Sequence, residues 1–237
     1  MKSEKRNNMT LFERLKGSRY FELSGLICLI ILYSVIVQSR SGNFLTLGNI
    51  NNILKEIVVY GILASALTFP LINGTFDLSI ESTCALGGTC CALLITDGLF
   101  GLKTNLFFAV ILSMLICSIV GVANGLLVSR TKIDPFIVTL GTQTAVRGIV
   151  YIVCNNSAVT SLPESFKYLS SGKVLGISVS IWILILVFVM MALILGKTSY
   201  GRKIYAIGGS YTAAYISGIN VKKIRFSTYI ISAALSC

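Results

Sequence analysis

Residues 104–129 read TNLFFAVILSMLICSIVGVANGLLVS, which is 26 consecutive residues without a charged side chain. A helix needs about 20 mostly apolar residues to cross the hydrocarbon core of a bilayer. In hydrocarbon, every backbone N–H and C=O must find a partner inside the segment, and a helix provides one for each. This stretch therefore predicts a membrane-spanning helix, and it decides the fold class of the chain.

Further apolar stretches lie on both sides of this one. We expect complete spans at residues 23–39, 54–73, 81–97, 104–129, 136–154 and 174–196, and a partial seventh at 226–237. None shows the apolar/polar alternation of a membrane β-barrel strand. The sequence thus predicts an all-α, polytopic transmembrane helix bundle that forms a single domain over residues 1–237.

The composition excludes several classes of site. The chain is 54% hydrophobic and 12% charged, whereas soluble domains have about 25% charged residues. It contains no His, which excludes Ser-His-Asp and Cys-His catalysis. Its seven Cys form no C-x-x-C pair, so we interpret them as small packing residues and expect no metal site. The net charge of +11 reflects basic residues that flank the spans, and we expect no nucleic-acid partner.

The Lys and Arg residues predict the orientation. If the N-terminus is cytoplasmic and six spans alternate, 14 of the 20 basic residues lie in inner segments and 5 in outer ones. Membrane proteins concentrate positive charge on the cytoplasmic side, which favours this orientation. The N-terminal inner cluster consists of Lys2, Lys5, Arg6, Arg14, Lys16 and Arg19. No A-x-A pattern follows the first apolar run, so an uncleaved span is favoured over a signal peptide.

A polar segment, NGTFDLSIES at residues 73–82, separates the second and third spans. Pro70 before it removes a helical hydrogen bond, and Gly74 permits backbone angles that other residues avoid. Asp77 and Glu81 are four residues apart and would share one face if the segment is helical. Two interpretations stay open: acids at membrane depth along a polar path, or an interfacial turn with both acids in water.

Arg147 and two glycines are the notable features of the later spans. Arg147 follows Phe136 by eleven residues, about 16 Å along a helix and close to mid-bilayer. It should therefore find an anion, Asp77 or Glu81, or else extend to the lipid headgroups. Gly121 and Gly125 form a G-x-x-x-G that permits close helix packing, within one bundle or between copies.

The longest polar connection, residues 197–225, is basic and lies on the predicted cytoplasmic side. Ser210 is a good N-cap and Gly218 a good C-terminal stop, so we expect a helix of about two turns between them. The residues expected on one face are Tyr211, Ala214 and Tyr215. A helix this short is unstable alone in water. It needs a surface to pack on, which is a groove of another protein, the membrane or its own bundle.

Three blocks of sequence resemble the ribose-type sugar permeases of bacterial ABC importers. Residues 74–82, with Asp77-Leu78-Ser79, are similar to the family's G-I-D-L-S-V-G-S. DPFIVTLGT at 134–142, followed by Arg147-Gly148, is similar to P-F-I-A-T-L-G … R-G. The most specific block runs from 201 to 221 and resembles G-R-x-I-Y-A-I-G-G-N … A-A-x-x-S-G-I-N-V.

This resemblance implies the membrane-spanning permease subunit of an importer that moves a ribose-like monosaccharide inward across the bacterial cell membrane. Its partners would be an ABC ATP-binding subunit, an extracytoplasmic sugar-binding protein and a second permease copy. ATP would be used by the partner subunit, and this chain would be neither an enzyme nor a direct binder of a cofactor. Accordingly, Gly208-Gly209 is not followed by the Gly-Lys-Ser/Thr of a phosphate loop.

The resemblance also implies roles for particular residues. Those that would line or brace the substrate path are Asn73, Asp77, Ser79, Glu81, Gln143 and Arg147. Those of the ATPase-coupling loop would be Gly201, Arg202, Gly208, Gly209, Ser210, Ala213, Ala214 and Gly218. Three positions depart from the family: Glu81 replaces Gly, Ser210 replaces Asn, and Thr212 replaces an acidic residue. The last residue, Cys237, falls within an apolar run, so a truncated product is expected.

Two other classes stay open. The charges Asp77, Glu81 and Arg147 would suit a secondary transporter driven by an ion gradient, although the break at Pro70–Gly74 has no matching second break. An integral membrane enzyme would have only Asp77 and Glu81 for acid–base work.

Overall fold

The computed structural model describes residues 19–96, 99, 101–160 and 162–237. Most of the predicted N-terminal basic cluster, Lys2 to Lys16, and residue 97 at the predicted end of the third span lie outside these residues. The chain divides into two compact units, Met1–Leu54 and Lys55–Cys237, which are described separately. A single domain over residues 1–237 stays a prediction.

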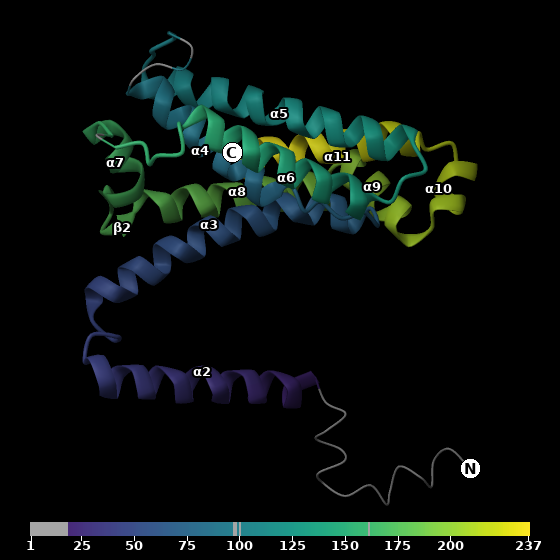
Figure 1. Ribbon diagram of the computed structural model, residues 1–237. Helices are drawn as coiled ribbons and strands as arrows, with labels where there is room; N and C mark the ends of the chain where they lie inside the picture. Colours follow the sequence, from purple (N-terminus) through teal and green to yellow (C-terminus); the bar gives the residue numbers. More distant parts are fainter. Residues whose placement is uncertain (1–18, 97–98, 100, 161) are drawn as a thin grey trace, which may run out of the picture. The chain divides into compact units, whose positions relative to one another are not determined.

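The first unit contains helix α2, Arg19–Ser41, and the start of α3, Leu47–Ile72 (Figure 1). Gln38 closes the connection between them: its Oε1 accepts from Leu45 N at 2.9 Å and its Nε2 donates to Gly42 O at 3.1 Å. Gly42 has a positive φ of 66°, which suits glycine. Large apolar side chains of α2 from Leu26 to Ile36 are not covered by other residues of the first unit.

Five helices of the described chain are long and apolar enough to cross a membrane. They are Ser24–Ser41 within α2, Leu47–Ile72 (α3), Leu106–Arg130 (α5), Pro135–Val153 (α6) and Val179–Lys197 (α8). α4, Ile80–Ile95, is apolar but has only 16 residues. The expected class, a polytopic helical membrane protein, is confirmed, whereas six complete spans, a partial seventh and the orientation stay predictions.

The shorter elements are α7 (Glu164–Ser171), β1 (Lys173–Val174), β2 (Ile177–Ser178), α9 (Ser199–Gly209), α10 (Tyr211–Ile216) and α11 (Val221–Ser236). β1 and β2 form an antiparallel hairpin where the span 174–196 was expected to begin. Its turn, Leu175-Gly176, has positive φ at both residues, as a tight hairpin turn requires. The all-α prediction missed this hairpin, because no strand alternation can show in two-residue strands.

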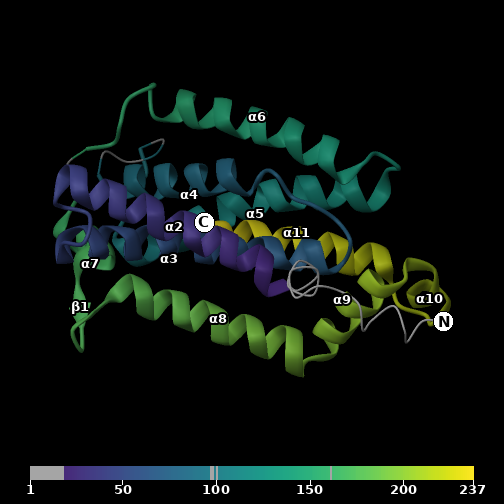
Figure 2. The same ribbon diagram turned by 90° about the horizontal axis from the view of Figure 1, so that it is seen from below.

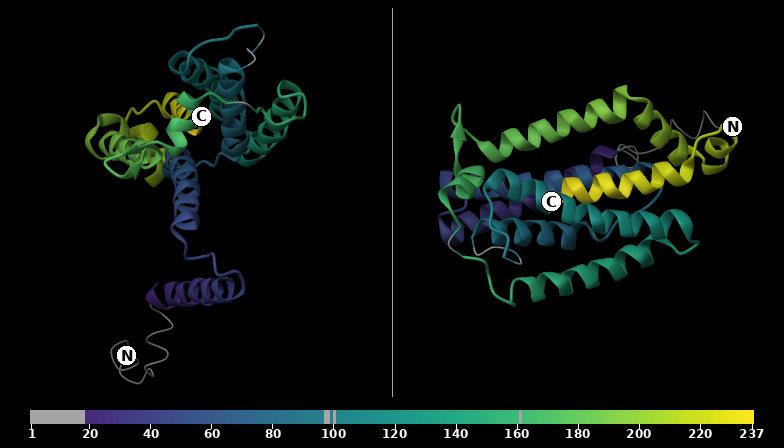
Figure 3. Two further views of the ribbon diagram at one scale, coloured as in Figure 1. Left: turned by 90° about the vertical axis from the view of Figure 1, so that its left-hand side faces the viewer. Right: turned by 90° about the horizontal axis from the view of Figure 1, so that it is seen from above.

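In the second unit, α4 packs against α5, α6 and α11, and α11 lies along α5. α6 and α8 lie on opposite sides of α4, α5 and α11 in two views (Figures 2 and 3). α7 and the β-hairpin occupy one end of this unit, and α9 and α10 occupy the other (Figure 1). Any function of α9 and α10 is therefore exerted at the end away from the hairpin.

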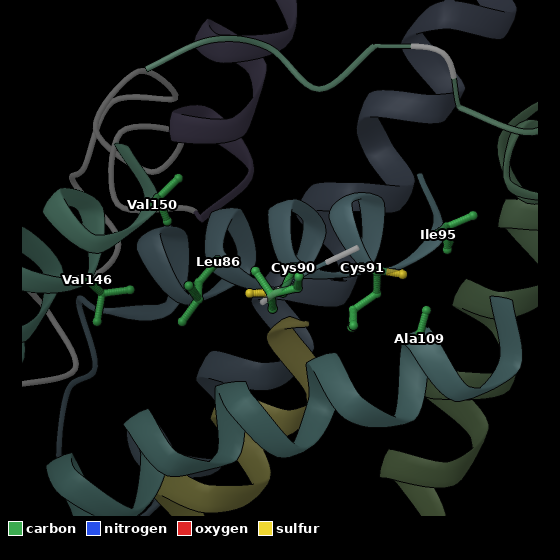
Figure 4. Close-up of a cluster of buried hydrophobic side chains, with 9 residues drawn as sticks. Leu86, Cys90, Cys91, Ile95, Ala109, Val146 and Val150 are labelled. Carbon is green, nitrogen blue, oxygen red and sulfur yellow. The ribbon is translucent and has the colours of Figure 1, made fainter. Parts of the chain in front are cut away.

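Small side chains make the centre of this unit dense. Leu86, Cys90 and Cys91 of α4 meet Ala109 of α5 and Val146 of α6 in one buried cluster (Figure 4). Cys90 is 2% exposed and bonded to no other cysteine. These thiols are packing residues, as expected from the usual burial of free cysteine.

The G-x-x-x-G of α5 faces α11. A Cβ at Gly121 would lie 2.6 Å from Tyr229 O, and one at Gly125 would lie 2.8 Å from Phe226 O. Both glycines thus permit backbone contact between α5 and α11 inside one bundle, the first of the two alternatives that the sequence left open.

Candidate functional site

α3 and α4 are joined by a polar, non-helical connection of residues 73–79, here called the 73–79 segment. α3 ends at Ile72 and is followed by Gly74 at φ 78°; Gly74 N donates to Leu71 O and Thr75 N donates to Pro70 O, each at 3.0 Å. This pair of bonds is a Schellman C-cap, which requires the left-handed conformation that glycine adopts easily. α4 begins only at Ile80. The condition for Asp77 and Glu81 to share a helix face is therefore not met, because Asp77 precedes the helix.

Asp77 is 3% exposed and is held by a chain of polar side chains. Its Oδ1 accepts from Ser79 Oγ at 2.6 Å and from Ser79 N at 3.0 Å. Ser79 Oγ accepts from Asn124 Nδ2 at 2.8 Å, and Asn124 Oδ1 accepts from Thr142 Oγ1 at 2.7 Å. Burial raises the pKa of Asp77, which lies between the two helices, while the Ser79 hydrogen bonds oppose that rise. The chain links the 73–79 segment to α5 and α6.

α11 holds the same segment from another direction. Asn73 Nδ2 donates to Thr228 Oγ1 at 2.8 Å, and Asn73 Oδ1 accepts from Thr75 Oγ1 at 3.2 Å. Tyr229 donates its hydroxyl to Phe76 O at 3.0 Å. Because buried polar groups must be paired to be tolerated, these bonds fix the path of the 73–79 segment between α5 and α11.

The predicted path residues of this segment are therefore enclosed in protein. Asn73, Asp77 and Ser79 are 0%, 3% and 2% exposed. In this arrangement they brace the helices, and the interpretation of both acids in water fails for Asp77. Sequence reasoning missed their partners Asn124, Thr142 and Thr228. The available signal was a polar side chain inside an apolar span, which is costly and so usually paired or functional.

A matched pair of threonines tests this bracing. Thr142→Val removes the donor to Asn124 Oδ1 and leaves that buried amide short of a partner, which costs about 1–3 kcal/mol. Thr144→Val, two residues on, removes only a bond to Leu140 O in its own helix. In detergent, we expect Thr142→Val to unfold at a clearly lower temperature and Thr144→Val to match the parent. Equal unfolding temperatures for both variants would contradict the bracing role.

The remaining predicted path residues form a separate, accessible group, which we call the Glu81 cluster: Glu81 of α4 with Gln143 and Arg147 of α6. Arg147 Nη2 lies 2.5 Å from Glu81 Oε1, and Gln143 Nε2 donates to Glu81 Oε2 at 3.4 Å. The side chains of Arg147 and Glu81 are 36% and 66% exposed. The anion expected for Arg147 is thus Glu81, and Asp77 lies in the other group. Since charges facing hydrocarbon are costly, the cluster requires water or another protein surface beside it.

The polar connection after α8 contains two helices, where only one was expected. α9, Ser199–Gly209, is capped by Thr198, whose Oγ1 accepts from Gly201 N at 3.1 Å. A Cβ at Gly201 would overlap Leu195 O, and one at Gly208 would overlap Ile72 O. α9 therefore sits directly on the end of α3, where the 73–79 segment begins. The signals that could have found α9 were the N-cap Thr198 and the i, i+4, i+7 spacing of Tyr200, Ile204 and Ile207.

The expected caps of α10 are present. Ser210 Oγ accepts from Ala213 N at 3.2 Å, and Gly218, at φ 80°, ends the helix. Gly218 N donates to Tyr215 O and Ile219 N donates to Ala214 O, which is a second Schellman cap. α10 spans only six residues, Tyr211–Ile216.

The three residues expected on one face of α10 differ in burial. Ala214 is buried against Ile207 and Val221, whereas Tyr215 and Ile216 are 67% and 78% exposed. Tyr211 is also exposed, at 45%. Tertiary contact turns the small residue inward, so the exposed apolar surface of α10 consists of the larger side chains.

The other predicted coupling residues lie on the same two helices. Arg202 donates from Nη2 to Ser199 Oγ at 2.7 Å. Ala213 and Gly209 are exposed, and no other described residue lies within 4 Å of a Cβ built at Gly209. Within the described chain, no group of three Cys, Asp or Glu side chains could hold a metal ion.

Comparison with known proteins adds a family match. Residues 49–237 match the family described as "Branched-chain amino acid transport system / permease component". The chain is 35% identical over 224 residues to the ribose import permease protein RbsC of Haemophilus influenzae, covering 93% of this chain and 68% of that protein. For RbsC of Escherichia coli K12, the identity is 32% over 234 residues, covering 94% and 71%.

The similarity extends to a permease named for another sugar. The L-arabinose ABC transporter permease protein AraH of Azospirillum brasilense is 31% identical over 213 residues, covering 90% of this chain and 61% of that protein. No solved structure matches the chain.

Proposed function

Because the chain belongs to the ribose-type permeases of ABC importers, we propose that it moves a monosaccharide, ribose or a similar sugar, inward across a bacterial cell membrane. ATP is hydrolysed by a partner subunit, and this chain forms the membrane-spanning subunit. Its N-terminus and the end that carries α9 and α10 face the cytoplasm, with six complete spans and a partial seventh. The end that carries α7 and the β-hairpin receives the sugar from an extracytoplasmic binding protein.

One observation carries this proposal. α10 is capped at both ends and seated by Ala214, yet it exposes Tyr215 and Ile216. Exposed apolar side chains on a short, fixed helix suit docking into a groove of another protein. In an importer, that groove belongs to the ATP-binding subunit. In this proposal, α9 transmits movement of α10 to the end of α3, because Gly208 lies against Ile72, next to the start of the 73–79 segment.

The Glu81 cluster is the part of the site that contacts the sugar in this proposal. Glu81, Gln143 and Arg147 provide acceptors and donors for sugar hydroxyls. They stand on α4 and α6 and are accessible. A second permease copy completes the path beside them, which supplies the polar surroundings that their charges require. Asn73, Asp77 and Ser79 do not contact the sugar in this proposal; they are buried and hold the helices that carry the path.

Charge introduced on α10 tests the docking role. Tyr215→Asp and Ile216→Asp place a carboxylate on the exposed surface of α10 without touching the buried Ala214. We expect both variants to insert and unfold like the parent, and to lose co-purification with the ATP-binding subunit of the same importer. The matched control is Leu175→Asp, 86% exposed in the hairpin turn at the opposite end, which should co-purify normally.

Sugar uptake then tests the energy source. With all subunits present, ribose uptake should stop in Tyr215→Asp and under ATP depletion, and should persist when the proton gradient is collapsed. Uptake that survives ATP depletion but needs the gradient would refute the importer and favour a secondary transporter. Normal co-purification of Tyr215→Asp would refute docking through α10.

A further inference from the structure

A basic pocket lies at the end of the second unit that carries α10. Its volume is about 330 Å³, and it lies between the last turn of α5 and the first turns of α11, with Tyr211 of α10 at its edge. The basic residues that line it are Arg130, Lys132, Lys222 and Arg225. A neighbouring cavity of about 350 Å³ shares Arg130 and Lys222 and adds Lys223. Figure 1 shows α5, α10 and α11 converging there.

These cations have no anionic partner among the described residues, whose ion pairs are Glu81–Arg147 and Glu164–Lys167. Arg225 is fixed in place, with its guanidinium carbon 5.1 Å from the centre of the Tyr211 ring. Its Nε is buried and has no hydrogen-bond acceptor among the residues that the structure describes. A buried donor without an acceptor is rare in folded proteins and requires an explanation. An anionic ligand in the pocket would provide one.

The position of the cations on α11 also points to an anion. Lys222 and Lys223 lie in the first turn of α11, where there is no acidic residue. The N-terminus of a helix carries partial positive charge, so lysines there weaken the helix. These lysines are therefore not explained by helix stability. A bound anion would be attracted by both the side chains and the helix terminus.

The position of the pocket along the helix bundle indicates which kind of anion would bind there. Arg130 is the last residue of α5, a 25-residue apolar helix long enough to span a membrane. The cavities therefore lie where hydrocarbon gives way to headgroups, and Leu126, Val128 and Phe226 add apolar walls. Basic pockets at this level of a membrane protein suit anionic lipid headgroups.

We propose that this basic pocket binds the headgroup of an anionic phospholipid. The phosphodiester is held between Arg130 of α5 and Lys222 and Arg225 of α11, and the acyl chains lie along the apolar wall at Phe226. Such a lipid would tie α5 to α11 next to α10. The inference does not depend on which solute is transported.

Lipid titration of the purified chain tests the proposal. The delipidated protein in detergent is titrated with phosphatidylglycerol, phosphatidylcholine or inorganic phosphate, and bound lipid is counted by native mass spectrometry. We expect saturable binding of phosphatidylglycerol only. Removing one cation should weaken it about fivefold, because each basic residue near an anionic lipid surface contributes that much. Arg130→Gln/Lys222→Gln should thus weaken binding by about a factor of 25.

The matched control is Lys197→Gln/Lys203→Gln, which removes two charges at the same end but outside both cavities. It should bind phosphatidylglycerol like the parent. The single variants Lys222→Gln and Arg130→Gln, each checked for a parental unfolding temperature, keep the comparison valid if the double variant misfolds. Equal binding of phosphatidylcholine, saturation by phosphate alone, or an equal loss in the control would each overturn the proposal.

Discussion

Gly208→Ala is expected to destabilise the protein and to abolish sugar uptake, although it adds one methyl group. The added Cβ would overlap Ile72 O, a backbone atom at the end of α3. A backbone atom is not free to move aside as the tip of a flexible side chain can, so α9 must separate from α3. Overpacking of this kind costs about 1–3 kcal/mol or more.

Gly209→Ala provides the matched control for this variant. It makes the same change one residue later, where none of the other residues that the structure describes lies within 4 Å of the added Cβ. Alanine is favoured over glycine in helices by up to about 1 kcal/mol, so Gly209→Ala should unfold at the parental temperature or slightly higher. Unfolding is followed with a maleimide dye that fluoresces on reaction with newly exposed thiols, since Cys90, Cys91 and Cys117 are buried. Parental stability and uptake in Gly208→Ala would show that α9 does not rest on α3.

Breaking the Glu81–Arg147 pair is expected to have the second largest effect. In Arg147→Leu, Glu81 loses its ion-pair partner, and in Glu81→Leu, Arg147 loses its own. Because both side chains are accessible, the charge left unpaired is partly solvated, and losing the pair costs up to about 1 kcal/mol of stability. We expect each single variant to unfold at a slightly lower temperature and to transport sugar well below the parental rate.

The double variant separates the two roles of this pair. Glu81→Leu/Arg147→Leu leaves no unpaired charge, so its stability should recover relative to either single variant. Its uptake should stay low if the cluster contacts the sugar, and recover if the pair only braces α4 against α6. The control is Glu164→Gln, which breaks the exposed pair with Lys167 and should change neither stability nor uptake. Additive losses in the double variant would show that the two residues do not interact.

The sequence predicted best the features that depend on neighbours along the chain. Gly74 and Gly218 each end a helix in a left-handed conformation, and Ser210 caps α10. These outcomes depend on backbone sterics and on hydrogen bonds that reach only a few residues, so a short stretch of sequence contains the information. The bounds were less accurate: α8 begins five residues after the expected start because residues 173–178 form a hairpin.

The burial and the partners of Asp77 and Glu81 could not be predicted from neighbouring residues in this way. Asp77 and Glu81 are four residues apart, yet one is buried beside Asn124 and Ser79 while the other faces outward to Arg147. The Schellman cap at Gly74 ends α3, and α4 begins only at Ile80. The non-helical residues between them direct Asp77 toward α5 and α11. Periodicity would place both acids on one face only in an unbroken helix, and the sequence could not show where the helix begins.

By itself, the sequence determined that this chain is a polytopic helical membrane protein of the sugar permease family, because span length, charge content and short motifs are local properties. The tertiary structure alone decided which polar residues are braces and which are accessible. It decided that Gly121 and Gly125 of α5 meet α11, that Glu81 is the partner of Arg147, and that α9 rests on the end of α3. Burial and pairing depend on which helices pack together, and those contacts join residues up to 155 positions apart.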